Sequence, residues 1–329
     1  MFPYIRLRRT RKFGWLRDLV AENSLSVSDL ILPVFVMKGE GVEEEIESLP
    51  GAKRYSIDKL EDIAKEAEEV GIRAITLFPC VDEELKTEDA EEAYNQENLI
   101  CKAIRHLKNK TSKLGIICDV ALDPYTTHGH DGILNESEID NDETLEALQN
   151  QALCLAKAGA DIVSPSDMMD GRVGAIREIL EENQFTDIPI IPYAAKYASS
   201  LYGPFRNALG TNKTLGISNK KTYQMDFRNS REAIREIEQD LSEGADAIIV
   251  KPATMYLDII NNAYNIFKVP IFAYHVSGEY AMLKYAHNAS VLDFDLALIE
   301  NLTAIKRAGA KSIITYGALE AAKILKDQS

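Results

Sequence analysis

The sequence predicts an α/β fold, a (β/α)8 TIM barrel preceded by an N-terminal arm. Short apolar runs alternate along the chain with longer segments of helical 3.6-residue period, as at 57–70 and 142–157. This alternation is typical of a parallel sheet that is buried on both faces. A weak internal repeat supports it, because several helical segments end on a glycine just before an apolar run. Glycine supplies the left-handed residue that ends a helix at little steric cost.

The expected strands reach the number that a closed barrel needs. Four apolar runs follow Gly71, Gly159, Gly244 and Gly309, and they span 74–78, 162–163, 247–250 and 312–315. The others are expected from apolar composition alone, at 30–36, 114–120, 188–193 and 269–276. No linker or low-complexity segment divides the chain. We therefore expect an arm over 1–28 and a single barrel domain over 29–329.

The charge of the chain is large, negative and unevenly placed. Its 329 residues carry a net charge of −15, which argues against nucleic acid or an anionic membrane surface as a partner. The first acid is Asp18, and before it stand only basic charges: Arg6, Arg8, Arg9, Arg11, Lys12 and Arg17. We expect this arm to dock on an acidic neighbouring subunit. No apolar stretch follows that could serve as a signal or a membrane span, so we expect a cytoplasmic protein.

The cysteines give no sign of a disulfide framework or a zinc knuckle. Cys80, Cys101, Cys118 and Cys154 are widely spaced and form no CxxC pair. We expect buried free thiols in a reducing compartment.

Two lysines stand just beyond expected strands. Lys251 closes the run 247–250, and Lys196 follows 188–193. Side chains at the carboxyl ends of barrel strands converge on one mouth, where the chemistry of such barrels takes place. Burial and a neighbouring ammonium lower a lysine's pKa from about 10.4, which leaves an amine able to attack a carbonyl group. The alternative is a lysine that extends from a strand end into solvent.

One connection is unusually long for a barrel. The segment 198–225 is rich in Gly, Asn, Ser and Lys and shows no regular pattern, so we expect an active-site lid. Its cations suit a small anionic substrate: Arg206, Lys213, Lys220 and Lys221. A solvated surface loop is the alternative.

Polar side chains are dense after the third expected strand, at 119–132. Carboxylates and imidazoles at a strand end are typical of a metal or acid–base site. His128 and His130 form an HxH pair, as in metal-dependent hydrolase barrels, but that class needs further histidines on later strand ends. The remaining histidines, His106, His275 and His287, do not supply them. A hydrogen-bonded polar turn is the other interpretation.

Two hydroxyls follow the last two expected strands, Ser277 and Tyr316. Both could bind a carboxylate without adding charge, although Ser277 could instead cap the helix after it. The chain has no GxGxxG and no P-loop, so we expect no nucleotide or other organic cofactor.

Four motifs together carry a family resemblance: YAAKYASSLYGPFR at 193–206, VKP at 250–252, VSGEYAM at 276–282 and the segment 119–134. From the basic arm to near the C-terminus, the chain closely resembles porphobilinogen synthases, also called 5-aminolevulinate dehydratases. The resemblance implies a hydro-lyase of tetrapyrrole (heme, porphyrin) biosynthesis. Such an enzyme condenses two 5-aminolevulinate molecules in one active site to porphobilinogen, with loss of two waters.

The resemblance also implies roles for individual residues. Lys251 would form an imine with the first substrate and Lys196 with the second, with Tyr193 orienting Lys196. Asp119 and Ser166 would serve the amine and the proton transfers. The implied carboxylate-binding residues are Ser277 and Tyr316 for the first substrate, and Arg206, Lys220 and Gln224 for the second.

Metal and assembly are also implied by the resemblance. Zinc-dependent members carry three cysteines where this chain has Ala121, Asp123 and Asp131, so we expect no zinc and an aspartate-rich type of site. Asp123 and Asp131 are candidate ligands for a harder cation, and Glu236 matches a regulatory magnesium position. The family implies a homo-octamer that interconverts with smaller forms, held by the N-terminal arms.

Two further departures from the family pattern concern single residues. Some members have arginine where this chain has Lys220, which would lose a two-pronged contact to carboxylate. We expect glutamine at the position of His275, which could add a titration or donate the same hydrogen bond.

Two other functions compete with the synthase. Another Schiff-base aldolase usually needs one reactive lysine and phosphate loops, which this sequence does not display. A catalytically silent barrel that binds keto acids is not favoured either, because both lysines and both carboxylate sites are present.

Overall fold

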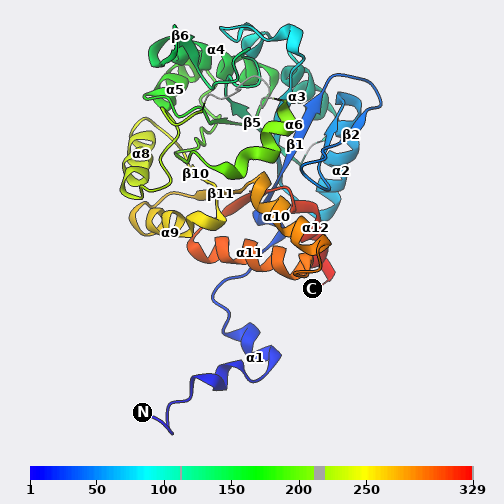
Figure 1. Cartoon of the computed structure of the whole chain (residues 1–329), viewed down its shortest axis with the longest axis vertical. Helices are drawn as coiled ribbons and strands as arrows, with labels where there is room; N and C mark the ends of the chain where they lie inside the picture. Colours follow the sequence, from blue (N-terminus) through cyan, green and yellow to red (C-terminus); the bar gives the residue numbers. More distant parts are fainter. Residues whose placement is uncertain (112, 211–218, 328–329) are drawn as a thin grey trace.

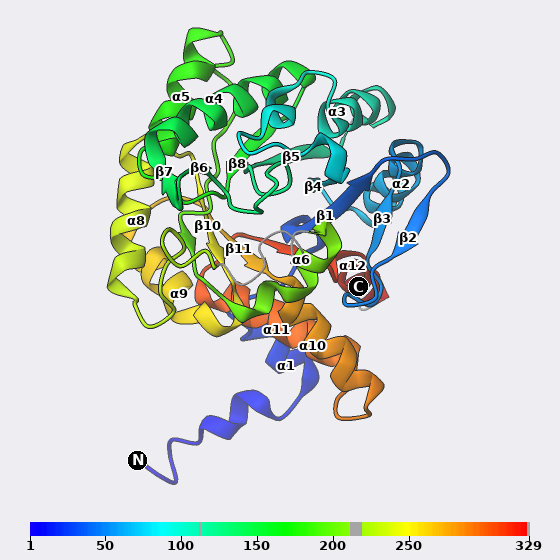
Figure 2. The same ribbon diagram turned by 45° about the horizontal axis from the view of Figure 1, so that its top comes forward.

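The fold prediction is confirmed by the computed structural model, which describes residues 1–111, 113–210 and 219–327. Eight parallel strands follow one another around a barrel in the order β8-β5-β4-β1-β12-β11-β10-β9 (Figure 2). They are β1 (Leu30–Met37), β4 (Ala74–Cys80), β5 (Gly115–Val120), β8 (Ile162–Pro165), β9 (Ala195–Lys196), β10 (Ile248–Lys251), β11 (Ile271–His275) and β12 (Ser312–Thr315).

The expected strand at 188–193 is wrong as a regular strand. Pro189 and Pro192 have no N–H to donate, so regular pairing starts only at β9. Backbone hydrogen bonds still join the segment to both neighbouring strands: Ile191 N donates to Val163 O (3.0 Å), and Ile249 N donates to Pro192 O (2.8 Å). The segment therefore closes the barrel between β8 and β10.

Helices surround the barrel, as Figure 1 shows. They are α2 (Leu60–Val70), α3 (Leu99–Lys110), α4 (Asn141–Ala158), α5 (Arg172–Glu182), α6 (Gly203–Leu209), α8 (Arg231–Ser242), α9 (Leu257–Ile266), α10 (Ser277–Asn288), α11 (Phe294–Ala308) and α12 (Ala318–Asp327). In α2 the buried residues are Leu60, Ile63, Ala64, Ala67 and Val70, the stripe that a 3.6-residue period places on one face. The glycines of the repeat end their helices with positive φ, for example 93° at Gly71 and 105° at Gly244.

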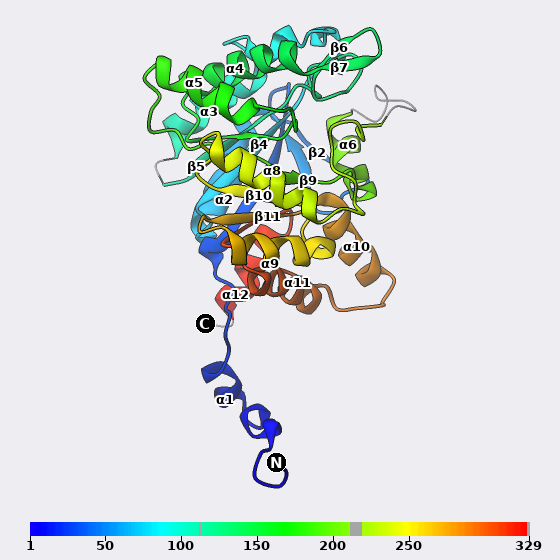
Figure 3. The ribbon, with the colours of Figure 1, turned by 90° about the vertical axis from the view of Figure 1, so that its left-hand side faces the viewer.

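The N-terminal segment projects away from the barrel (Figures 1 and 3). It contains a 3₁₀ helix at Leu7–Arg11 and helix α1 (Gly14–Leu19). Every residue of 1–24 except Leu16 is exposed, and Leu25 and Val27 are the first to pack against the core. Large apolar side chains on this segment face solvent: Phe2, Tyr4, Ile5, Leu7, Phe13, Trp15 and Leu19. Exposed apolar side chains gathered on one segment in this way are typical of an interface.

Two small hairpins lie outside the ring of parallel strands. Strands β2 (Glu43–Glu45) and β3 (Lys53–Tyr55) pair antiparallel, and β3 also pairs with β1. Strands β6 (Ile133–Asn135) and β7 (Glu138–Asp140) form the other hairpin. No helix in the described part of the chain is long and apolar enough to cross a membrane.

The segment expected to be a lid is more regular than its composition indicates. Residues Ser200–Tyr202 form a 3₁₀ turn, and α6 follows directly. Pro204 in the first turn of α6 and Gly210 just after it are favourable helix-end residues. The expectation of an irregular segment is therefore wrong for 200–209. Residues 211–218 of the expected lid, Lys213 among them, lie outside the described residues.

Candidate active site

Lys196 and Lys251 lie directly opposite each other. Strands β9 and β10 are parallel neighbours, and their register pairs the two lysines as Cα partners. Parallel neighbours in register point their side chains to the same face. Both side chains are buried, with exposed fractions of 5% for Lys196 and 6% for Lys251.

The Lys251 amine lies in a cage of aromatic rings. Its Nζ lies 4.9 Å from the ring centre of Tyr193, 5.1 Å from Tyr202, 5.1 Å from Phe205 and 4.7 Å from Tyr274. Burial, reinforced by the ammonium of Lys196, lowers the pKa of Lys251 to about 7, against the opposing effect of nearby carboxylates. A substantial fraction of this lysine is therefore the free amine near neutral pH, which is the nucleophilic form.

Lys196 is directed toward the end of β8. Its Nζ donates a hydrogen bond to Ser166 O and lies 3.8 Å from a carboxylate oxygen of Asp131. Ser166 also acts on the Asp119 carboxyl group and favours its charged form. Burial raises the pKa of Asp119 to about 7, although Lys196 and Lys251 act to lower it. Asp119 can therefore take up or release a proton near neutral pH beside both amines.

Tyr193, which the resemblance implied would orient Lys196, makes no hydrogen bond to that lysine among the described residues. Its ring faces Lys251, and its hydroxyl has no hydrogen-bond partner among the described residues. The physical reason is that Lys196 is drawn to the Ser166 carbonyl and to Asp131 instead. Tyr193 stabilises the charged form of Lys251 through its π-face.

Lys220 lies between two carboxylates. Its Nζ is 2.9 Å from Asp123 and 3.1 Å from Asp131, and the lysine is buried. Burial alone would lower the pKa of Lys220, but the two carboxylates raise it above its ordinary value. Asp123 and Asp131 thus share the ammonium of Lys220. The described residues contain no group of three or more His, Cys, Asp or Glu side chains that could hold a metal ion.

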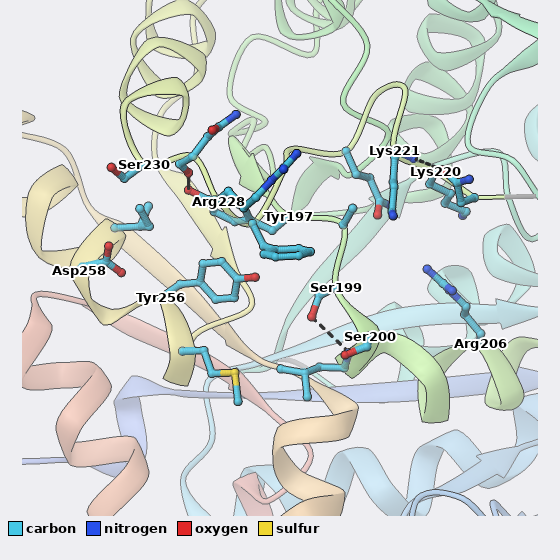
Figure 4. Close-up of a pocket in the computed structure, with 18 residues that line it drawn as sticks. Tyr197, Ser199, Ser200, Arg206, Lys220, Lys221, Arg228, Ser230, Tyr256 and Asp258 are labelled. Carbon is cyan, nitrogen blue, oxygen red and sulfur yellow. Dashed lines mark hydrogen bonds between the residues drawn. The ribbon is translucent and has the colours of Figure 1, made fainter.

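A cavity of about 830 Å³ brings together the three residues expected to bind the second carboxylate, Arg206, Lys220 and Gln224. Figure 4 shows Arg206, Lys220 and Lys221 on one side of it, with Tyr256 and Asp258 on the other. Neither Lys196 nor Lys251 is among the residues that line it. Arg206 and Lys220 therefore line the cavity. Lys196 and Lys251 are buried at the carboxyl ends of β9 and β10.

Ser277 and Tyr316 are both buried. Ser277 is the first residue of α10, so the alternative that it caps this helix is wrong, because Val276 holds that position. Its hydroxyl accepts a hydrogen bond from Phe205 N (3.0 Å) and donates to Leu201 O (3.3 Å). The hydroxyls of Tyr316 and Tyr274 share a hydrogen bond of 3.0 Å.

Glu236 is half-buried on α8. It lines a second cavity of about 720 Å³, whose other acidic residues are Glu138, Asp170, Asp226 and Glu232. Burial raises the pKa of Glu236, and the nearby carboxylates add to the effect. These acidic residues line one cavity, but among the described residues they do not form a group of three or more that could hold a metal ion.

Several of the histidines hydrogen-bond to other protein groups. His128 Nε2 lies 3.2 Å from Glu88 O, and His130 Nδ1 lies 3.0 Å from the Tyr223 hydroxyl, which favours the polar-turn interpretation. Burial lowers the pKa of His275 to about 4, and its Nδ1 lies 3.0 Å from the Thr315 hydroxyl. His275 is therefore neutral near pH 7, which leaves the hydrogen bond as its role.

Only one of the four rings around Lys251, that of Tyr193, was expected from the sequence. Tyr202 and Phe205 belong to the segment expected to be a lid, and Tyr274 alternates with His275 on β11. The period-2 alternation of strands could have placed Tyr274 inside the barrel. No local sequence pattern could have placed the rings of Tyr202, in a 3₁₀ turn, and Phe205, in α6, beside the Lys251 amine.

Fold and site together define a (β/α)8-barrel enzyme with two buried lysine amines on neighbouring strands. The chain belongs to the delta-aminolevulinic acid dehydratase family, whose sequence profile matches residues 4–324. It is a lyase of porphyrin biosynthesis.

Individual relatives agree with this assignment. The chain is 50% identical over 324 residues to the delta-aminolevulinic acid dehydratase of Bradyrhizobium diazoefficiens, covering 98% of this chain and 92% of the relative. It is 50% identical over 319 residues to that of Methanothermus sociabilis, covering 97% and 98%. The crystal structure of the Toxoplasma gondii ME49 enzyme, a porphobilinogen synthase in complex with its product porphobilinogen, matches with a TM-score of 0.97. That match has 49% identity and covers 99% of this chain and 92% of that chain.

Proposed function

We propose that this chain condenses two 5-aminolevulinate molecules to porphobilinogen, releasing two waters, through imines on Lys251 and Lys196. The observation that carries the proposal is the aromatic cage in which Lys251, with a pKa of about 7, faces Lys196 across neighbouring strands. The product requires one new C–C and one new C–N bond between two keto acids. Two carbonyl-activating amines side by side supply the activation for both.

We assign proton transfer to Asp119, which interacts with both amines. An amine that adds to a ketone gives a carbinolamine, which loses water to form the imine, and both steps move protons. Asp119, with a pKa of about 7, would exchange these protons, and Ser166 would hold it in place. The first substrate would place its carboxylate at Ser277 and Tyr316, whose hydroxyls would exchange their present internal partners for it.

The second substrate would lie next to Arg206 and Lys220, which line the cavity. Arg206 would bind its carboxylate, with Gln224 beside it. Lys220 would contribute only by sharing its charge between that carboxylate and its present partners, Asp123 and Asp131. We therefore assign the larger part of the binding to Arg206.

The most direct test is incubation of the purified protein with 5-aminolevulinate, followed by a colour reaction for the pyrrole. Pyrrole formation is expected. A protein that binds the keto acid but forms no pyrrole, with or without added metal ions, would be the silent barrel. A single aldol product without a pyrrole would indicate an aldolase.

We expect zinc to be dispensable and magnesium to act at a distance from the amines. Ala121 offers no ligand, and Asp123 and Asp131 both already pair with the ammonium of Lys220. Glu236 and its acidic neighbours would hold magnesium through oxygen ligands. A zinc-selective chelator should leave the rate of pyrrole formation unchanged, whereas removal of magnesium should lower activity or shrink the assembly. Stoichiometric zinc in active protein, lost and regained together with activity, would contradict this assignment.

The segment 1–28 is assigned to assembly, in a cytoplasmic homo-octamer that interconverts with smaller forms. Its exposed aromatic and aliphatic side chains and its basic charges suit an acidic neighbouring barrel. Deletion of residues 1–17 removes all six basic residues before Asp18 and should shift the assembly to smaller species in sedimentation, more strongly at high salt if ion pairs dominate. Deletion of residues 328–329 is the matched control. An unchanged sedimentation profile after the N-terminal deletion would refute the assignment.

A further inference from the structure

Arg54 joins the β2–β3 hairpin to helix α6, which lies about 150 residues later in the chain. Its Nε donates to Ala208 O at 2.6 Å, and its Nη2 donates to Asn207 O at 3.0 Å. The remaining nitrogen, Nη1, pairs with the carboxylate of Glu44 on β2. The Arg54 side chain is only 18% exposed. Each of the three guanidinium nitrogens therefore makes one contact, two with α6 and one with the hairpin.

The hydrogen bonds from Arg54 reach carbonyl groups at the carboxyl end of α6. The carbonyl groups at the end of a helix carry its partial negative charge, so a cation there is favourable. Gly210, with φ of 78°, ends α6 directly after these carbonyls. Cys80 on β4 also donates from its thiol to Ala208 O (3.3 Å). The carboxyl end of α6 is thus fixed to the barrel by Arg54 and, more weakly, by Cys80.

Helix α6 carries two residues of the site. The Phe205 ring lies 5.1 Å from Lys251 Nζ and packs edge-on against Phe78 at 5.1 Å. The next residue, Arg206, lines the cavity of the cations. At the other end of the helix, Phe205 N donates to Ser277 Oγ. One short helix, held at both ends, therefore places one wall of the Lys251 cage and one cation of the cavity.

We propose that Arg54 is a positioning residue, which holds α6 so that Phe205 covers Lys251 and Arg206 faces the second substrate. The inference rests on the roles proposed above for Lys251 and Arg206. Arg54 itself touches neither substrate nor the reacting amines. Arg54 affects catalysis only by fixing the position of α6.

Loss of Arg54 has two distinct consequences for catalysis. Arg206 would be held less firmly, so the KM for 5-aminolevulinate should rise more than kcat falls. Water would also reach Lys251 past Phe205. Since burial is the main cause of the low pKa of Lys251, that pKa should then rise toward its ordinary value.

The charged groups that act on Lys251 lie elsewhere. They are Lys196, Asp119, Asp123 and Asp131, and none belongs to α6 or the hairpin. A variant at Arg54 leaves them unchanged. At a given pH a higher pKa means less free amine, so the acidic limb of the pH–rate profile should move to higher pH.

The test is a comparison of Arg54→Ala with Arg54→Lys and Lys53→Ala. Arg54→Ala should raise KM about tenfold, as expected for loss of two charge-assisted hydrogen bonds that act indirectly, and should shift the acidic limb upward. Arg54→Lys keeps one cationic donor and should recover part of both effects. Lys53 is the matched control, because its ammonium pairs with Glu43 and Glu45 within the hairpin. Lys53→Ala should therefore leave KM and the pH profile unchanged.

The outcomes separate this inference from the roles on which it rests. Unchanged KM and an unchanged acidic limb in Arg54→Ala would overturn it, as would a fall in thermal stability with neither effect. The same is true if Lys53→Ala reproduces both effects. Borohydride capture on Lys251 in the parent enzyme and the KM of Arg206→Ala test the underlying roles directly. If those two results are as expected and Arg54→Ala is silent, only the positioning role fails.

Discussion

Replacement of Lys251 by alanine is expected to abolish pyrrole formation, with a loss in kcat on the order of 10⁴-fold or more. The reason is that neither positioning nor electrostatics can replace a missing nucleophile. In the parent enzyme, borohydride added with 5-aminolevulinate should reduce the imine to a stable amine. The peptide that contains Lys251 should then gain the mass of the substrate minus one water and plus two hydrogens. The yield of this adduct should increase as the pH rises through about 7, because the free amine forms there.

Lys284 provides a matched control for this experiment. Its ammonium also lies over aromatic rings, 5.4 Å from the ring centre of Tyr280 and 3.7 Å from that of Phe294, but it pairs with Glu320. Lys284→Ala should retain activity, and Lys284 should carry no adduct. A reduced adduct found only on lysines other than Lys196 and Lys251 would rule out the mechanism.

Arg206→Ala is expected to raise the KM for 5-aminolevulinate by about 30-fold, or about 2 kcal/mol. This is the lower end of the range for removal of one partner from a desolvated ion pair, about 2–4 kcal/mol, because Arg206 is only half-buried before substrate binds. The imine on Lys251 should still be trapped by borohydride, because Arg206 serves the second substrate. Steady-state kinetics measure the rise in KM, and peptide mass spectrometry detects the reduced adduct on Lys251.

Arg228 is the control for Arg206. It lines the same cavity, but it is exposed and bound to Asp226, with Nε 3.0 Å from a carboxylate oxygen. Arg228→Ala should change KM by less than about twofold, as is usual for exposed ion pairs. If Arg206→Ala leaves KM unchanged, or if Arg228→Ala matches it, the carboxylate does not bind at Arg206.

Much of the site could be anticipated because the geometry of a parallel barrel is simple. The carboxyl ends of all strands meet at one mouth, so Lys196, Lys251 and Asp119 had to come close once their strands were identified. The glycines that end the helices, such as Gly159, made the strand starts visible in the sequence. The prediction at 188–193 was wrong because prolines suit the apolar composition of a strand but cannot donate to its hydrogen bonds.

The sequence alone therefore determined the barrel, the two amines at its mouth and, through the family motifs, the kind of reaction. The tertiary structure decided what surrounds each group. Lys220 pairs with Asp123 across 97 positions, and Arg54 reaches Ala208 across 154. Periodicity and spacing describe neighbours along one helix or strand, where the backbone fixes the distances. Contacts between distant segments depend on how all the elements pack at once, and the low pKa of Lys251 is such a property, since burial by four different rings causes it.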